Sequence, residues 1–238
     1  MDNQFNSFDT QYPNLVSNLD ETAKAVFYRK TYMHVALAVL AFIGVEALLL
    51  KIPFVVETMM SLTSGFLWIA ILVAFGVGSA FANKMAHSMS RTTQYLGLGL
   101  YVIFEAIIFV PIIYIALYYS GGGLEMISQA GIITVGLFAG LTAVVFITNT
   151  NFSFLKTGLT IFFFIALAMI IAGAIFGFEL GLWFSALMVV FAGGTILYQT
   201  SQLKYEYDSS QYVGAALGLF SSLMLLFWYI LRIFMSRD

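Results

Sequence analysis

Glu105 lies inside a long apolar stretch, where an ionised side chain is energetically unfavourable. It is ten residues into the stretch Tyr95–Tyr118, which places it about 15 Å along a helix. A carboxyl group at that depth in a bilayer must face the interior of a helix bundle, find a partner or stay protonated. Glu105 is therefore a candidate cation or proton site, with a neutral, hydrogen-bonded structural carboxyl as the alternative.

Glu46 is a second candidate for such an ion or proton site. It lies deep in the apolar stretch Tyr32–Ile52, nearer to the outer end of that stretch. The nearby cation Lys51 is five residues further on, whereas ion pairs on a helix form between residues three or four apart. A structural role is therefore the preferred interpretation for Glu46.

Pro111 follows Glu105 by six residues. A proline inside a helix removes one backbone hydrogen bond and clashes with the carbonyl group four residues earlier, here that of Ile107. The sequence therefore predicts a helix kink near Pro111, and such a kink could open a cavity beside Glu105.

Other reactive patterns are missing from the sequence. It contains no cysteine, no HExxH histidine pair, no GxSxG serine and no phosphate-binding glycine fingerprint. No lysine is central in an apolar stretch, so a Schiff-base cofactor has no attachment point. We therefore expect no catalytic residue, metal site, cofactor or small-molecule substrate, and a protein that is not an enzyme.

The elements that position these residues are apolar stretches long enough to cross a bilayer, which takes about 20 residues each. The chain has 238 residues, of which 61% are hydrophobic and only 9% charged, whereas soluble domains carry about 25% charged residues. We predict an all-α integral membrane protein with a polar tail over residues 1–31 and a seven-helix bundle over residues 32–238. The predicted spans are Tyr32–Ile52, Ser64–Ala82, Tyr95–Tyr118, Ala130–Asn149, Thr157–Phe176, Leu180–Gln199 and Tyr212–Phe234.

The connections between the spans carry unequal numbers of Lys and Arg residues. Seven are on the side of the N-terminus and three on the other side. Because positive charge is enriched on the cytoplasmic side of a membrane, we predict a cytoplasmic N-terminus and an extracytoplasmic C-terminus. No basic patch suggests a nucleic acid as partner.

Several short motifs, in order along the chain, resemble the Bax inhibitor (TMBIM) family, and its bacterial YccA-like branch in particular. The C-terminal signature is carried by residues 196–202, 215–220, 226–227 and 230–232, and further matches are residues 29–32, 82–84, Pro111 and residues 152–155. The resemblance implies a seven-helix bundle with a cytoplasmic N-terminus in the bacterial inner membrane. It also implies either calcium leak across the membrane or, for the YccA-like branch, binding and restraint of the FtsH-type AAA protease.

The sequence departs from the family at the residues that accompany calcium leak. Family members that leak calcium have two aspartates, and the corresponding positions here are Gln199 and Ser222. A carboxylate pair can share a proton and switch with pH, which Gln and Ser cannot do. Asn151 also replaces an acidic residue that is common in the family.

Two functions therefore stay open. The first is a non-enzymatic modulator or partner of the FtsH-type protease, with the tail Met1–Thr31 as the segment that the protease would grip. The second is a calcium or proton leak channel with Glu105 as its intramembrane acid. Channels display rings or pairs of polar groups, and few polar residues lie within these spans, so the sequence favours the regulatory function.

Overall fold

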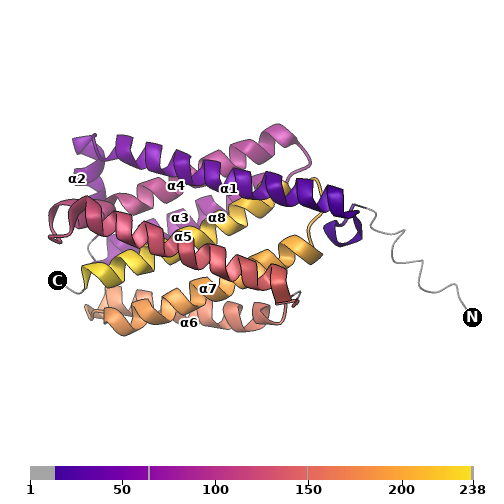
Figure 1. Ribbon diagram of the computed structural model, residues 1–238. Coiled ribbons are helices and arrows are strands. Elements are labelled where there is room, and N and C mark those ends of the chain that lie inside the picture. The colour runs from indigo at the N-terminus through magenta and orange to yellow at the C-terminus, as the bar shows by residue number, and fades with distance from the viewer. Residues whose placement is uncertain (1–13, 64, 149, 237–238) are drawn as a thin grey trace, which may run out of the picture.

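The computed structural model describes residues 14–63, 65–148 and 150–236, and it is helical throughout these ranges apart from the short connections (Figure 1). A short 3-10 helix, η1 (Val16–Asn18), precedes eight α-helices. These are α1 (Glu21–Leu49), α2 (Pro53–Ser61), α3 (Gly65–Ala86), α4 (Arg91–Tyr118), α5 (Gly123–Thr148), α6 (Leu155–Phe176), α7 (Gly181–Tyr205) and α8 (Tyr212–Met235). All of them except α2 are long and apolar enough to span a membrane. The predicted all-α bundle with seven candidate spans is thus confirmed, while its orientation in a membrane stays a prediction.

The first two helices differ in extent from the predicted elements. Helix α1 begins at Glu21 rather than at Tyr32, because the Asp20 side chain accepts a hydrogen bond from the Ala23 amide and caps the helix. The segment after it, predicted as a connection, forms α2, which has Pro53 in its first turn, where the fixed φ of proline suits a helix start. The length of an apolar stretch indicates neither the start of α1 at Glu21 nor the presence of α2.

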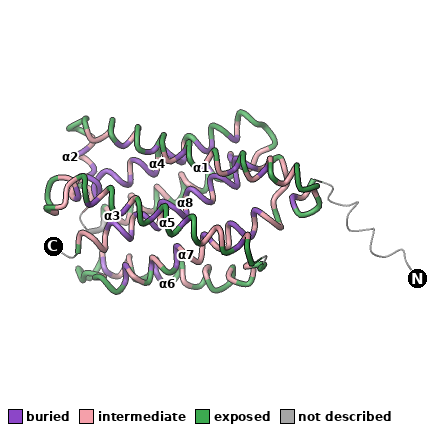
Figure 2. The backbone as a smooth tube through the Cα atoms, in the orientation of Figure 1, coloured by how far each residue is buried: buried purple, intermediate pink, exposed green. Residues whose placement is uncertain are grey.

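Helix α8 runs through the middle of the bundle and is the most buried of the seven candidate spans (Figure 2). It contacts α1, α4, α5 and α7. Helix α6 is the least buried and packs mainly on α3 and α7. Large apolar side chains of α6, such as Ile161 and Phe164, are exposed on the outer surface, as expected where lipid is the solvent.

The N-terminal segment is attached to the connection between α7 and α8. The Val16 amide donates to the Tyr207 carbonyl at 2.9 Å, and the Ser209 amide donates to the Asn14 carbonyl at 2.9 Å. Val16 is fully buried. We call the end of the bundle that holds this attachment the tail end, and the end that holds α2, the α6–α7 turn and the end of α8 the opposite end (Figure 1).

Candidate functional site

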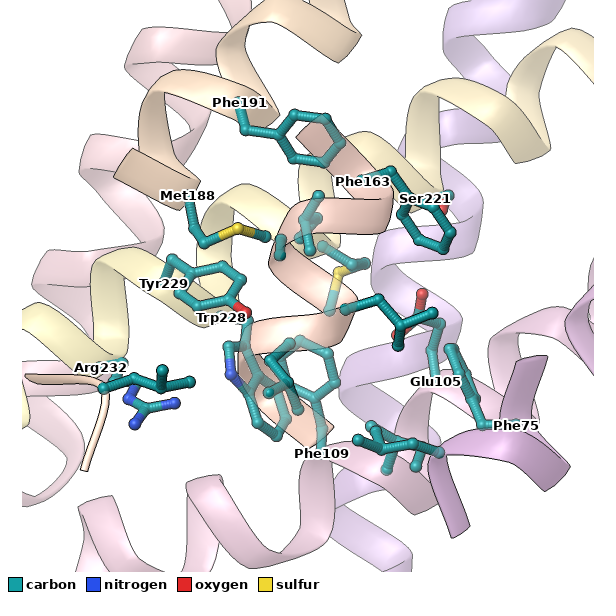
Figure 3. A pocket seen from close by; sticks show the side chains of 18 of the residues that line it. Phe75, Glu105, Phe109, Phe163, Met188, Phe191, Ser221, Trp228, Tyr229 and Arg232 are labelled. Atoms are coloured by element: carbon teal, nitrogen blue, oxygen red, sulfur yellow. The ribbon is translucent and has the colours of Figure 1, made fainter. Parts of the chain in front are cut away.

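The helices around α8 leave a cavity of about 670 Å³. Its walls come from α3, α4, α6, α7 and α8 (Figure 3). Along α7 the lining residues extend from Leu180 to Gln199, which is roughly 28 Å at the rise of an α-helix. The cavity therefore reaches from the opposite end of the bundle to well past the middle of the apolar region.

Polar side chains from α4, α7 and α8 gather in the inner part of this cavity. Glu105 is only 6% exposed and lines it. Tyr101, one helical turn before Glu105, donates a hydrogen bond of 2.7 Å to Ser221 Oγ, and its hydroxyl also interacts with the Glu105 carboxyl. Gln199 and Ser222, the positions that the resemblance assigned to an aspartate pair, line the same cavity.

Glycine lets Gln199 approach the central helix. A Cβ atom at Gly218 would lie 2.7 Å from Gln199 Oε1, closer than real side chains come. Gly218 is one turn before Ser222, so α8 presents small residues along the face that the polar side chains occupy. The close approach places Gln199 at the inner limit of the cavity on α7.

The other two candidate residues lie outside the cavity lining. Glu46 is 5% exposed, and neither of its carboxyl oxygens has a hydrogen-bond partner among the described residues. Pro111 is buried inside α4, which continues without interruption to Tyr118. The structure thus brings together Glu105, Gln199 and Ser222 but leaves Glu46 and Pro111 apart from them.

Two charged residues at the mouth of the cavity were not identified as site residues from the sequence. Glu179 in the α6–α7 turn and Arg232 near the end of α8 both line the cavity at the opposite end. Tyr101 and Ser221 were also missed. The spacing of four residues between Tyr101 and Glu105 is a signal that could have found Tyr101, since it puts both side chains on one helix face.

Within the described residues, no cluster of three or more His, Asp or Glu side chains could hold a metal ion. The inner cavity instead offers one carboxyl group with neutral hydroxyl and amide groups around it. Such a set can bind a proton, or a cation that keeps part of its hydration shell, because neutral oxygens also serve as cation ligands.

Comparison with known proteins agrees with this architecture. The model of the family described as "Inhibitor of apoptosis-promoting Bax1" matches residues 24–238, nearly the whole chain. The chain belongs to this family. The resemblance seen in the sequence is thereby confirmed, and the protein is a membrane protein of the Bax inhibitor family, which is not a known enzyme family.

One curated relative is similar over about half of the chain. "Uncharacterized protein PA2604" of Pseudomonas aeruginosa is 34% identical over 125 residues, which cover 52% of this chain and 55% of that protein. Its name attributes no activity to it. In this member of the Bax inhibitor family, Gln199 and Ser222 face one cavity, and Glu105 is the carboxyl group that lines its inner part.

Proposed function

We propose that this protein is a cation or proton leak pathway of a bacterial inner membrane, with Glu105 as the ion-binding group. The observation that carries the proposal is the position of Glu105, buried and lining a cavity that enters the bundle from the opposite end. The sequence disfavoured this function because polar residues are few in each span. In the folded chain, the few that exist are drawn from three helices to one place.

The geometry supports a specific division of roles. An ion would enter between Glu179 and Arg232 and reach Glu105 along the cavity. The hydroxyls of Tyr101 and Ser221 would replace part of its hydration shell. Gln199, held against Gly218, limits the cavity towards the tail end, so passage requires Gln199 to move. Because Gln199 and Ser222 do not titrate, any pH response of the inner cavity would follow Glu105 rather than a shared proton between two acids.

Flux measurements in liposomes test the proposal. Vesicles loaded with a calcium-sensitive or a pH-sensitive dye should show protein-dependent influx, and Glu105→Gln should abolish it. Glu46→Gln is the matched control, since it removes a carboxyl group equally buried in the bundle but outside the cavity. Equal flux in empty and protein-containing vesicles for both ions, or full flux in Glu105→Gln, would reject the leak pathway.

We further propose, as a second function, that the protein is a partner of an FtsH-type membrane protease. The observation that favours it is the attachment of the N-terminal segment, since Val16 is fully buried and the Val16 amide bonds to the Tyr207 carbonyl. A protease that pulls on the preceding residues must first break this attachment. The stability of the attachment would therefore set how readily the protease extracts the protein from the membrane.

Turnover in cells tests the second proposal. Deleting residues 2–20 should lengthen the lifetime of the protein, because the protease can no longer bind the N-terminal tail. Val16→Asp should shorten it, because burying an unpaired carboxylate releases the attached segment. The adjacent Ser17→Asp is the control, since Ser17 is exposed. Lifetimes that are the same for all these variants in cells with and without the protease would contradict the partnership.

A further inference from the structure

The outer part of the cavity has a different character from the polar inner part. Between the mouth and Glu105 its walls are apolar and aromatic, with Trp68 and Phe75 on α3, Ile170 on α6 and Trp228 on α8 among them. Figure 3 shows Arg232 and Glu105 on opposite sides of the cavity, with Trp228 and Tyr229 nearer to Arg232. This part of the cavity offers few hydrogen-bonding groups to water.

An apolar space is poorly suited to water and unfavourable when empty. Apolar cavities stay dry or take up apolar ligands, and walls without a partner lose their dispersion contacts. The whole cavity, its polar inner part included, measures about 670 Å³, which is within the range of roughly 300–1,000 Å³ of sites that hold small ligands. Phe163 and Phe178 line the cavity and are still 51% and 48% exposed, so the cavity is open beside α6, where hydrocarbon chains of a bilayer would be the available apolar ligand.

The charges at the mouth determine which head group would accompany such a chain. Arg232 is half-buried, and neither its side chain nor that of Glu179 has an ion pair or hydrogen bond among the described residues. A guanidinium group binds phosphate oxygens, and a carboxylate binds a primary ammonium group. Both residues lie near helix ends, at the level where a spanning helix meets the head groups. A head group with one phosphate and one ammonium group therefore complements this pair.

We propose that the outer part of the cavity binds a phosphatidylethanolamine molecule, with one acyl chain beside α6, its phosphate on Arg232 and its ammonium group on Glu179. This site lies on the outer part of the route proposed above for the ion, so a bound lipid has to make room before an ion passes. Lipid occupancy is measurable without flux, so each proposal can fail while the other holds. An anionic lipid would satisfy Arg232 but would be repelled by Glu179. The pair thus selects for a zwitterionic head group over an anionic one.

The three tryptophans of the chain provide a direct test. Trp68 and Trp228 line the cavity, whereas Trp183 is 84% exposed on α7. Lipids with brominated acyl chains quench tryptophan fluorescence on contact. A Trp183→Phe variant reports on the cavity alone, and a variant with both Trp68→Phe and Trp228→Phe reports on the outer surface alone. Both are reconstituted in phosphatidylcholine vesicles that contain a fixed fraction of brominated phosphatidylethanolamine or brominated phosphatidylglycerol.

We expect the cavity tryptophans to be quenched more strongly by brominated phosphatidylethanolamine than by brominated phosphatidylglycerol, and Trp183 to be quenched equally by both. In the Trp183→Phe background, Arg232→Gln should weaken the binding of phosphatidylethanolamine about fivefold, the effect of one cation at a head group. Glu179→Gln should remove the discrimination against phosphatidylglycerol. Lys51→Gln, at the same end but outside the cavity lining, should change neither.

A steric variant separates cavity binding from surface binding. Ala166 is buried in the cavity wall, and Ala168, on the same helix, is exposed. Ala166→Phe should reduce quenching of Trp68 and Trp228 by phosphatidylethanolamine, and Ala168→Phe should leave it unchanged. Equal quenching by the two lipids, stronger quenching by phosphatidylglycerol, or insensitivity to both Arg232→Gln and Ala166→Phe would overturn the proposal. If Arg232→Gln does not fold, Arg232→Lys keeps the charge and should retain most of the preference.

Discussion

The amide oxygen of Gln199 lies directly against the backbone of Gly218, at the place where a Cβ atom would be only 2.7 Å away. One turn earlier on α8, the ring of His87 occupies the corresponding position beside Gly214, where a Cβ atom would likewise lie 2.7 Å from Nε2. Two glycines on one face of the central helix thus receive polar side chains from two other segments. The inner limit of the cavity therefore depends on how closely α7 packs on α8, because Gln199 forms this limit and lies against Gly218.

Adding one methyl group at Gly218 should therefore destabilise the protein. Gly218→Ala displaces a side-chain end that can rotate, so we expect a loss of about 1 kcal/mol. Gly97→Ala should cost more, about 2–3 kcal/mol, because its Cβ would lie 2.5 Å from the Ala86 backbone nitrogen, which cannot move alone. Thermal unfolding in detergent measures both. Gly99→Ala is the control, since nothing lies within 4 Å of that Cβ position, and an equal loss in all three variants would contradict the steric explanation.

The hydrogen bond between Tyr101 and Ser221 should stabilise the contact between α4 and α8 next to Glu105. Tyr101→Phe and Ser221→Ala should each reduce the free energy of unfolding by about 0.5–1.5 kcal/mol. Because both remove the same hydrogen bond of 2.7 Å, the double variant should lose less than the sum of the two. Additive losses in this double-mutant cycle would show that the hydroxyl groups act independently.

The carboxyl group of Glu46 should lower the free energy of unfolding of the protein. Both of its carboxyl oxygens are buried and have no partner among the described residues. Replacing the carboxyl group by an apolar one removes a desolvation penalty, so Glu46→Leu should raise the free energy of unfolding by about 1–3 kcal/mol. Chemical denaturation in detergent tests this. A lower stability of Glu46→Leu would indicate that the carboxyl group makes an interaction that the fold requires.

Tyr207, in the connection between α7 and α8, should make the tail end sensitive to alkaline pH. Burial, with a smaller contribution from nearby Tyr198 and Glu206, raises the pKa of Tyr207 to about 12 from its usual 10. Because this pKa is higher in the folded state than in the unfolded state, the neutral phenol contributes fully to the stability of the folded protein below pH 10. This contribution is lost as the pH rises from about 10 to 12. The full loss is about 2–3 kcal/mol.

The stability difference between wild type and Tyr207→Phe should therefore be constant below pH 10 and should shift in favour of the variant above it. Unfolding midpoints of the wild type and of Tyr207→Phe, measured from neutral pH up to a pH of about 12, provide the test. A difference that does not change with pH would mean that the phenol of Tyr207 reaches water without unfolding of this region.

Local features of the amino-acid sequence were enough to establish the class of protein and the number of spans. Apolar length is a local property, so each span could be identified from its own residues. Several short motifs, taken in their order along the chain, were sufficient to identify the family. The extension of α1 to Glu21 and the presence of α2 were missed because the cap at Asp20 and the proline start at Pro53 do not alter the apolar pattern.

The direction in which each side chain faces became known from the packed bundle alone. In a soluble helix the polar face marks the outside, but these helices are apolar on the lipid side and on the packed side alike, so the pattern carries little directional information. The sequence placed Glu105 and Glu46 inside their spans but could not show which of the two faces a cavity. Packing among α3, α4, α6, α7 and α8 put Glu105 on a cavity with Gln199 and left Glu46 outside its lining, because that choice depends on contacts between helices far apart in the chain.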